Sequence, residues 1–549
     1  MNYATISFLC FLLMTGIVYF IVPKKLQWLV LLIASLLFYI LSCGIMAMFL
    51  PAAAAVVYAA GLLLSREDDR LTLRLKEAAD MTAMTAAGNG DDVPIRSDNK
   101  AAKKALKKQT ERKKKKIVAV SVALLILMIL STKYCNFFGS AANSAAGLLG
   151  FGKLLPTFHI IMPLGISYYT LMGISYITDV YRKSIPAERN PLRLLLFLCY
   201  FPHITEGPFE RYGQLGPQLK EAHSISYDRI KSGGIRLLWG IFKKLVIADR
   251  AGLIVSTIFP HHSDYSGGAL AIAAILYTLQ IYAEFSGCMD IVCGTSQMLG
   301  INMPENFRQP FFSRSISEFW RRWHITLGQW LKDYIFYPVS LSRHFRAINE
   351  KARKHISSRH LLTLIPSAYA LFFVWFCNGL WHGAGIKFII YGLYYYVLMM
   401  LGQALKPLSD KCLSSLGVSR DSKPYHIFEV LRTCAAVCFG MIIFRSESLS
   451  QAASIFSRLF LHPGLSRTVG ELSAIKGIDG WDYMILFLSV LLLLAVSMAK
   501  ERGIELRSSL SRKILPIRWT AYMLLIFSIV ILGAYGGDFV NTTFIYGEF

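Results

Sequence analysis

Long apolar runs, separated by short polar segments, recur along the whole chain. An α-helix needs about 17–25 apolar residues to cross the hydrocarbon core of a bilayer, and many of these runs reach that length. The pattern predicts an all-α, polytopic integral membrane protein with roughly 11–13 membrane segments. The predicted segments are 7–22, 28–41, 46–64, 117–130, 158–178, 192–204, 235–254, 270–285, 361–381, 387–405, 427–444, 481–498 and 517–532.

Two of these segments differ from an ordinary internal span, one by its short length and one by its position at the N-terminus. Segment 192–204 is short for a crossing, so we expect it to be re-entrant or to lie between other helices. Segment 7–22 is predicted to be a retained span and not a signal peptide. No basic residue precedes it, and no small-residue cleavage site follows it.

Basic loops predict the orientation, because they stay on the cytoplasmic side of a membrane. Lys24 and Lys25 follow the first run, the basic segment 65–116 follows the third, and loop 500–518 is basic as well. The N-terminus and the tail 536–549 are therefore expected outside, which requires an even number of crossings. At least one predicted segment then fails to cross, or one crossing is missing.

The predicted regions are N-terminal spans (1–64), a basic, partly disordered cytoplasmic loop (65–116) and a membrane core with an extracytoplasmic tail (117–549).

The basic segment 65–116 is the one stretch that resembles soluble protein. It begins with a helix-prone run of mixed charge, 66–80, continues through a low-complexity middle and ends in lysines. Such a polar middle favours disorder. We expect a tolerated insertion whose lysines lie on anionic lipid, and a docking site for an acidic partner is the alternative.

Composition narrows the class of protein further. The chain is 54% hydrophobic and only 17% charged, with a mean hydropathy of +0.46, unlike a soluble protein of this length. Its net charge of +24 is explained by basic cytoplasmic loops, and no nucleic-acid-binding motif is seen. The ten cysteines include no Cys-x-x-Cys pair, so neither a disulfide framework nor a structural metal is expected.

Two histidines inside apolar, aromatic sequence are the candidate catalytic groups. Ionisable side chains at membrane depth are costly, and histidine moves protons near neutral pH. His324 lies in segment 315–337, where charged residues and tryptophans alternate too closely for a lipid-facing helix. This mixture fits a helix that dips into a protein-lined cavity. It fits equally well an interfacial helix whose charges only reach lipid headgroups.

His382 follows Asn378 by four residues, so both share a face if the segment is helical. An Asn one turn away can orient an imidazole or donate to a developing oxyanion. Gly379 and Gly383 allow another chain or a ligand to approach closely. Taken alone, His382 also fits a hydrogen-bonded structural histidine. The residues expected to support the two histidines are Asn378, Trp323, Trp381, Arg321, Glu318 and Asp333.

The stretch 315–338, with Phe-Trp-Arg-Arg-Trp-His at 319–324, resembles the signature of membrane-bound O-acyltransferases. It is most similar to the bacterial branch that contains alginate O-acetyltransferase and the D-alanyl transfer protein of teichoic acid synthesis. Further matching pieces follow in order along most of the chain. They are 162–170, 179–182, 201–203, 207–208, 211–212, 378–383 and 543–546.

The resemblance implies that His382 is the catalytic histidine and His324 the second signature histidine. It implies a thioester donor on the cytoplasmic side, with acetyl-CoA expected and no tightly bound cofactor or metal. It also implies a polysaccharide acceptor, often reached through an extracytoplasmic O-acetyltransferase, and a central cavity or funnel that joins the two faces of a bacterial plasma membrane. His382 would act as general base, with Asn378 or His324 stabilising the oxyanion.

Two other functions remain open at this point. D-Alanyl transfer from an acyl-carrier protein to teichoic acid keeps the family and changes the donor. A polysaccharide or lipid transporter without acyl-transfer chemistry is a different class. The lack of a visible internal repeat and the histidine-containing signature both count against it.

Overall fold

The computed structural model describes residues 3–88, 94–156 and 162–535. Within these ranges the chain is helical, and its one strand-like pairing is an isolated bridge between Phe307 and Trp323. The all-α prediction is confirmed. The tail 536–549, with the matching piece 543–546, and residues 158–161 of a predicted span lie outside the described residues.

The chain forms two compact units. The first contains Met1–Ile17, Glu206–Pro208 and His223–Phe549, and the second contains Val18–Thr205 and Phe209–Ala222. Helix α1 (Ile6–Ile21) runs from the first unit into the second. The other helices of the second unit are α2 (Gln27–Cys43), α3 (Phe49–Gly88), α4 (Pro94–Ile129), α5 (Cys135–Leu148), α6 (Ile166–Tyr181), α7 (Pro191–Cys199) and α8 (Tyr212–Lys220).

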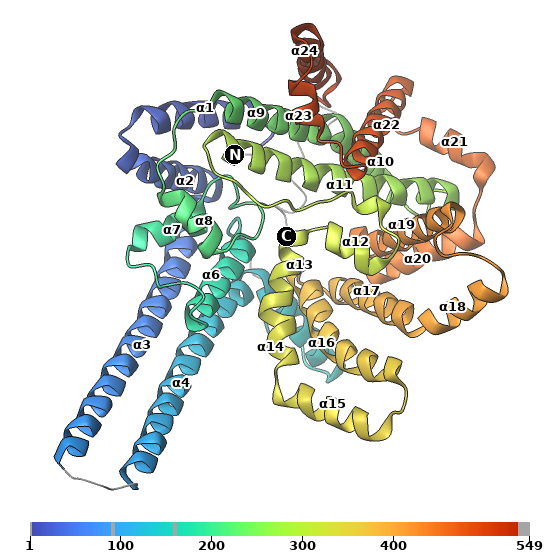
Figure 1. Ribbon diagram of the computed structural model, residues 1–549. Coiled ribbons are helices and arrows are strands. Elements are labelled where there is room, and N and C mark those ends of the chain that lie inside the picture. The colour runs from blue at the N-terminus through green and yellow to red at the C-terminus, as the bar shows by residue number, and fades with distance from the viewer. Residues whose placement is uncertain (1–2, 89–93, 157–161, 536–549) are drawn as a thin grey trace. The chain divides into compact units, whose positions relative to one another are not determined.

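In the second unit, α3 and α4 lie side by side as a long hairpin (Figure 1). Leu71 and Leu75, one turn apart, are less exposed than their neighbours on α3, as expected for a helix–helix seam. Lys114 on α4 pairs with Asp68 on α3 at 3.0 Å. The helix predicted over 66–80 is confirmed, and the described parts of the basic segment 65–116 form two helices where the sequence predicted a loop.

The helices of the larger unit follow in chain order. They are α9 (Tyr227–Phe242), α10 (Asp249–Ile258), α11 (Gly267–Met298), α12 (Ile316–Arg322), α13 (Ile325–Leu331), α14 (Tyr337–Ser340), α15 (Arg343–His355), α16 (Arg359–His382), α17 (Ile386–Ala404), α18 (Lys406–Ser415), α19 (Lys423–Arg445), α20 (Leu449–Leu461), α21 (Leu465–Ser473), α22 (Gly480–Glu501), α23 (Leu506–Ser511) and α24 (Leu515–Leu532). Wider π-helical turns occur at Leu130–Tyr134, Lys243–Ala248 and Lys332–Phe336, and 3₁₀ turns at Lys24–Leu26, Gly44–Met48 and Pro310–Phe312.

Eight helical segments of the described chain are long and apolar enough to cross a membrane. They are Lys24–Asp80, which contains α2 and α3 in succession, Lys100–Leu148, Gly267–Met298, Arg359–His382, Ile386–Ala404, Lys423–Arg445, Gly480–Glu501 and Leu515–Leu532. The outward side chains of α24 are apolar: Ile531, for example, is 71% exposed. Such a surface needs lipid around it, so the protein is a polytopic membrane protein.

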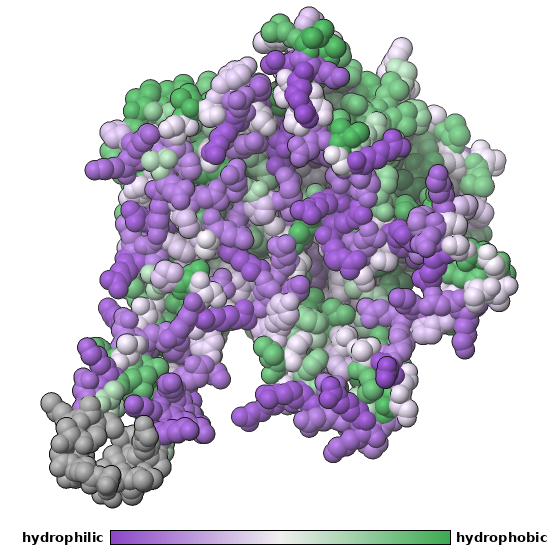
Figure 2. Space-filling view, in the orientation of Figure 1, coloured by the Kyte–Doolittle hydropathy of each residue, from purple (hydrophilic) through white to green (hydrophobic). Residues whose placement is uncertain are grey.

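The space-filling view distinguishes apolar from polar helices of this larger unit (Figure 2). Hydrophobic side chains gather over α24, whereas the visible face of α15 is hydrophilic. Along α15, Phe345, Ile348 and Ala352 recur at the spacing of one helical face, and they are less exposed than the charged residues between them, Arg346, Glu350 and Lys351. Helix α15 is therefore an amphipathic surface helix that packs on α16.

Two predicted spans take a different form. Segment 192–204 yields the nine-residue α7, about 14 Å long at 1.5 Å per residue, which is too short to cross. Segment 235–254 is divided among α9, the π-helical turn and α10. The short α7 agrees with the expectation that segment 192–204 does not cross. Segment 235–254 was predicted from mean hydropathy alone, which does not detect which charges pair inside the protein.

Helices α9 and α11 pack closely against each other in the larger unit, and glycines allow it. A Cβ on Gly294 would lie 2.5 Å from the carbonyl oxygen of Gly233, and one on Gly287 would lie 2.8 Å from that of Gly240. No side chain fits at either crossing, so the two backbones meet directly. This contact sets the polar residues of α9 against those of α11.

Candidate active site

His324 lies in the turn between α12 and α13 and is 2% exposed. Its backbone is left-handed, with φ 49° and ψ 50°, which is uncommon for a residue other than glycine. Backbone pairing holds this turn in place: Ile325 N–H donates to the carbonyl of Asn306 at 3.0 Å, and Arg308 N–H donates to that of Arg322 at 2.9 Å. Strained residues of this kind gather at functional sites.

The imidazole of His324 is surrounded by aromatic rings and one amide. Its ring centroid lies 4.8 Å from that of Phe285 and 5.6 Å from that of Trp381, both edge to face. Its Nδ1 lies 3.4 Å from Oδ1 of Asn306. The ring is therefore held on several sides within the protein.

His382 is the last residue of α16, and Asn378 lies one turn before it. The two side chains are 3% and 4% exposed, so the shared buried face predicted from their spacing is present. The His382 ring centroid lies 5.5 Å from that of Tyr391 and 5.2 Å from that of Phe444. Oδ1 of Asn378 is buried and accepts no hydrogen bond from the described residues.

Trp381 brings the two histidines together. Its ring centroid lies 5.6 Å from that of His324 and 4.9 Å from that of His382, with both pairs edge to face. Two imidazoles from sequence positions 58 residues apart thus contact one indole. The arrangement provides two proton-accepting groups in an aromatic, water-poor environment.

The other predicted supporting residues fall into different environments. Trp323 is 2% exposed and stacks on Phe319 at 5.4 Å, so it packs the core behind His324. Glu318 pairs with Arg322 at 2.8 Å, as expected for neighbouring turns. Arg321 is exposed and lies outside the cluster, and Asp333 is half-buried on the π-helical turn after α13.

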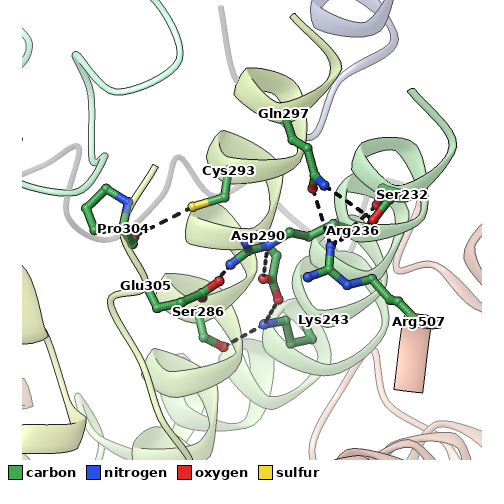
Figure 3. Close-up of polar contacts among 10 residues, drawn as sticks. All are labelled: Ser232, Arg236, Lys243, Ser286, Asp290, Cys293, Gln297, Pro304, Glu305 and Arg507. Atoms are coloured by element: carbon green, nitrogen blue, oxygen red, sulfur yellow. Dashed lines mark hydrogen bonds and ion pairs between the residues drawn. The ribbon is translucent and has the colours of Figure 1, made fainter. Parts of the chain in front are cut away.

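An ionic cluster beside this site, buried at Lys243 and exposed at Glu305, was not predicted (Figure 3). Asp290 on α11 accepts from Arg236 at 2.8 Å and from Lys243 at 2.7 Å, and Lys243 also donates to Ser286 at 2.9 Å. Arg236 reaches Glu305 at 2.6 Å. A second pair, Lys244 with Glu284 at 2.9 Å, has both side chains almost completely buried.

The ionic cluster borders a polar pocket of about 470 Å³, including its open mouth. Asn306 lines this pocket and also contacts His324, so the pocket wall adjoins the histidine site. The sequence carried one signal for the cluster, namely the pair Lys243 and Lys244 inside the otherwise apolar stretch 237–248. Charges at such positions require partners, which here come from α11. Among the described residues no group of three or more His, Cys, Asp or Glu side chains is placed to hold a metal ion.

Comparison with known proteins places these features in a family. A sequence model of MBOAT, the membrane-bound O-acyltransferase family, matches residues 124–415, which is more than half of the chain. A probable alginate O-acetylase AlgI of Pseudomonas syringae pv. tomato is 34% identical over 332 residues, or 60% of this chain and 57% of that protein.

Two other relatives act on different polymers by their names. A peptidoglycan O-acetyltransferase of Helicobacter pylori is 28% identical over 360 residues, covering 61% of this chain and 62% of that protein. A teichoic acid D-alanyltransferase of Bacillus subtilis is 31% identical over 301 residues, covering 53% and 71%. The matched part spans less than two thirds of the alginate O-acetylase. Both signature histidines lie within the matched range, and the chain belongs to the membrane-bound O-acyltransferase family.

Proposed function

We propose that this protein is an O-acyltransferase that moves an acetyl group from a cytoplasmic thioester donor toward hydroxyls of an exported cell-surface polysaccharide. One observation carries the proposal: two buried imidazoles, His324 and His382, contact the same indole. The similarity to O-acetylases of alginate and peptidoglycan supports the choice of an acetyl group and a polysaccharide.

The reaction needs a base, an oxyanion donor and the exclusion of water. His382 takes the proton from the acceptor hydroxyl, whose oxygen attacks the thioester carbonyl. The new C–O bond forms, the C–S bond breaks, and the imidazolium returns its proton to the leaving thiolate. Asn378, one turn away, or His324 stabilises the tetrahedral oxyanion. Burial keeps competing water away from the thioester.

We propose acetyl-CoA as the donor and no tightly bound cofactor. The partners in this proposal are membrane lipids and an extracytoplasmic O-acetyltransferase or the polysaccharide itself. Its place is a bacterial plasma membrane, with both ends of the chain outside and a central cavity or funnel joining the two faces. The proposal includes 11–13 membrane segments, roughly, because short segments such as α1 add to the long helices.

A second function, D-alanyl transfer to teichoic acid, is favoured by one specific similarity, that to the teichoic acid D-alanyltransferase. The same two histidines would serve it, because a D-alanyl thioester presents the same carbonyl chemistry. The donor then would be an acyl-carrier protein.

The test uses purified protein in lipid nanodiscs. Labelled acetyl-CoA is supplied with fragments of alginate, peptidoglycan or teichoic acid, and a parallel reaction supplies a D-alanyl carrier protein. We expect alkali-labile acetyl ester and released CoA, both reduced about 10²–10⁴-fold by His382→Ala. Equal transfer by wild type and His382→Ala would make His382 structural. Transfer from the D-alanyl donor alone would establish the second function.

A further inference from the structure

Asn306 lies in the extended segment between α11 and α12 and is 1% exposed. Its backbone carbonyl accepts from Ile325 N–H at 3.0 Å. Its side-chain oxygen accepts from both the N–H and the hydroxyl of Thr326, each at 3.0 Å. One residue thus binds the turn that carries His324 through three strong hydrogen bonds.

The orientation of the Asn306 amide follows from these donors. A backbone N–H can only donate, so the amide atom 3.0 Å from Thr326 N must be the oxygen and not the NH₂ group. The NH₂ group then points to the sulfur of Met289, 3.2 Å away. Turning the amide over would set its NH₂ group against the backbone N–H of Thr326, so that two donors would face each other.

This orientation determines which nitrogen of His324 carries the proton. The amide oxygen has lone pairs but no hydrogen, so the imidazole Nδ1, 3.4 Å away, must be the donor. A neutral ring protonated at Nδ1 has its lone pair on Nε2. Free histidine prefers the opposite tautomer, so the protein imposes this one. The distance is long for a hydrogen bond, as is common before substrate binds.

We infer that Asn306 is a positioning residue for the proposed acyl transfer: it holds His324 as the Nδ1–H tautomer and so provides a basic Nε2 in the site. The inference rests on the proposed function for its catalytic meaning and on geometry for the tautomer. It extends the histidine pair to a residue that touches neither reacting atom.

The segment that carries Asn306 is itself anchored on its other side. The neighbouring Glu305 binds Arg236 at 2.6 Å, which ties the segment to α9. The titratable and charged groups around His324 and Asn306 are His382 on α16 and, along the pocket wall, Asp290, Lys243, Arg236, Glu305, Lys500 and Tyr282. Four of these pocket-wall charges are paired with one another, namely Asp290, Lys243, Arg236 and Glu305, so a new charge at position 306 would act on His324 and on Lys500.

The experiment compares three variants. Asn306→Ala removes the acceptor, Asn306→Asp keeps the acceptor and adds a charge, and Asn143→Ala is the matched control. Asn143 likewise accepts two backbone N–H bonds, at 2.9 Å each, but lies in the other unit. We expect Asn306→Ala to lower kcat about 10–100-fold with little change in KM. The control should leave both unchanged.

The Asn306→Asp variant tests the role of Asn306 through the pH–rate profile. A purely structural role for Asn306 would leave that profile unchanged. A carboxylate stabilises the imidazolium of His324, so the basic form appears only at higher pH. We expect most of kcat to be retained at high pH and the acidic limb of the pH–rate profile to move upward. An unchanged profile in Asn306→Asp, or a wild-type kcat in Asn306→Ala, would overturn the inference. If Asn306→Ala does not fold, the Asn306→Asp profile decides.

Nitrogen-15 NMR of histidine-labelled protein separates this inference from the proposed function. The His324 signal, assigned as the one missing in His324→Gln, should report Nδ1–H in wild type and shift toward Nε2–H in Asn306→Ala. If wild type transfers no acyl group but its His324 tautomer differs from that of Asn306→Ala as expected, the proposed function fails and the role of Asn306 stands. If wild type and Asn306→Ala show the same tautomer, the role of Asn306 is refuted.

Discussion

The ammonium group of Lys243 lies 2.7 Å from the carboxylate of Asp290, with side chains 5% and 13% exposed. Asp290 also accepts from Arg236 at 2.8 Å, so one carboxylate compensates two buried cations. Removing one partner of a buried pair typically costs about 3–5 kcal/mol, because the remaining charge is uncompensated. We expect Asp290→Asn to lower the thermal unfolding midpoint strongly, measured by scanning fluorimetry in detergent.

Glu67→Gln is the control for this prediction. Glu67 pairs with Arg70 at 2.9 Å, with side chains 14% and 67% exposed, so the cation that the substitution leaves behind lies in solvent. Surface pairs contribute about 0–1 kcal/mol, so the midpoint should hardly change. Similar midpoints for both variants would mean that the cluster does not stabilise the larger unit.

The contact between α16 and α17 predicts a steric effect. A Cβ on Gly379 would lie 2.4 Å from the carbonyl oxygen of Phe388, which is backbone and cannot turn away. Gly379→Ala should therefore push the helices apart, at a cost of about 1–3 kcal/mol or more, and should displace His382 three residues later. We expect a lower unfolding midpoint together with a loss of acyl transfer.

Gly402→Ala is the matched control on the same helix pair. Nothing lies within 4 Å of the Cβ position at Gly402 in α17, and alanine is the better helix former. Its midpoint should equal or slightly exceed that of wild type. A Gly379→Ala protein that behaves like Gly402→Ala would show that α16 and α17 are not closely packed at the site.

Asn378 offers a way to separate activity from stability. Its Oδ1 is buried and accepts no hydrogen bond from the described residues, so Asn378→Leu should leave the unfolding midpoint unchanged or raised. If the amide stabilises the oxyanion, the same variant should lose about 10²–10³-fold in kcat. A variant with normal turnover would exclude Asn378 from the chemistry, and one that unfolds would make its role structural.

The polar part of the α3–α4 hairpin, residues 69–108, should be dispensable for catalysis. Replacing residues 69–108 with a short Gly/Ser linker keeps the Asp68–Lys114 pair, at 3.0 Å, and the lysines that signal orientation. Packed helices lie about 8–10 Å apart, a gap that such a linker spans. We expect acyl transfer within twofold of wild type. A collapse of transfer at unchanged expression and orientation would instead assign the hairpin to donor or partner recruitment.

Much of the larger organisation was predictable from the sequence. The length of apolar runs predicted the membrane helices, because a bilayer of nearly constant thickness selects helix length. The spacing of Asn378 and His382 predicted their shared face, because a helix repeats every 3.6 residues. Both inferences depend only on local geometry.

Other features depend on contacts between distant segments. The left-handed turn at His324 exists because Asn306, 18 residues earlier, binds the two residues that follow His324, while Arg308 binds the backbone before it. The run 235–254 looked like a span because a hydropathy average treats Lys243 as a small penalty. In the fold the ammonium group of Lys243 is paired with Asp290, and this pairing offsets the free-energy cost of removing the charge from water. The turn at His324 has no local sequence pattern, and the lysines at 243 and 244 indicate that partners are needed without identifying Asp290.

The two glycine crossings of α9 and α11 have a mechanical consequence. A single crossing would leave two helices free to pivot about it. Here Gly233 meets Gly294 and Gly240 meets Gly287, two points seven residues apart on each helix, or about 10 Å along the axis. Two fixed points prevent α9 and α11 from pivoting about each other or sliding past each other, so the two helices move as one rigid body. Any movement of the larger unit that admits substrate must therefore have its hinge outside this pair. The backbone amides of α9 and α11 should be among the last to exchange with deuterium.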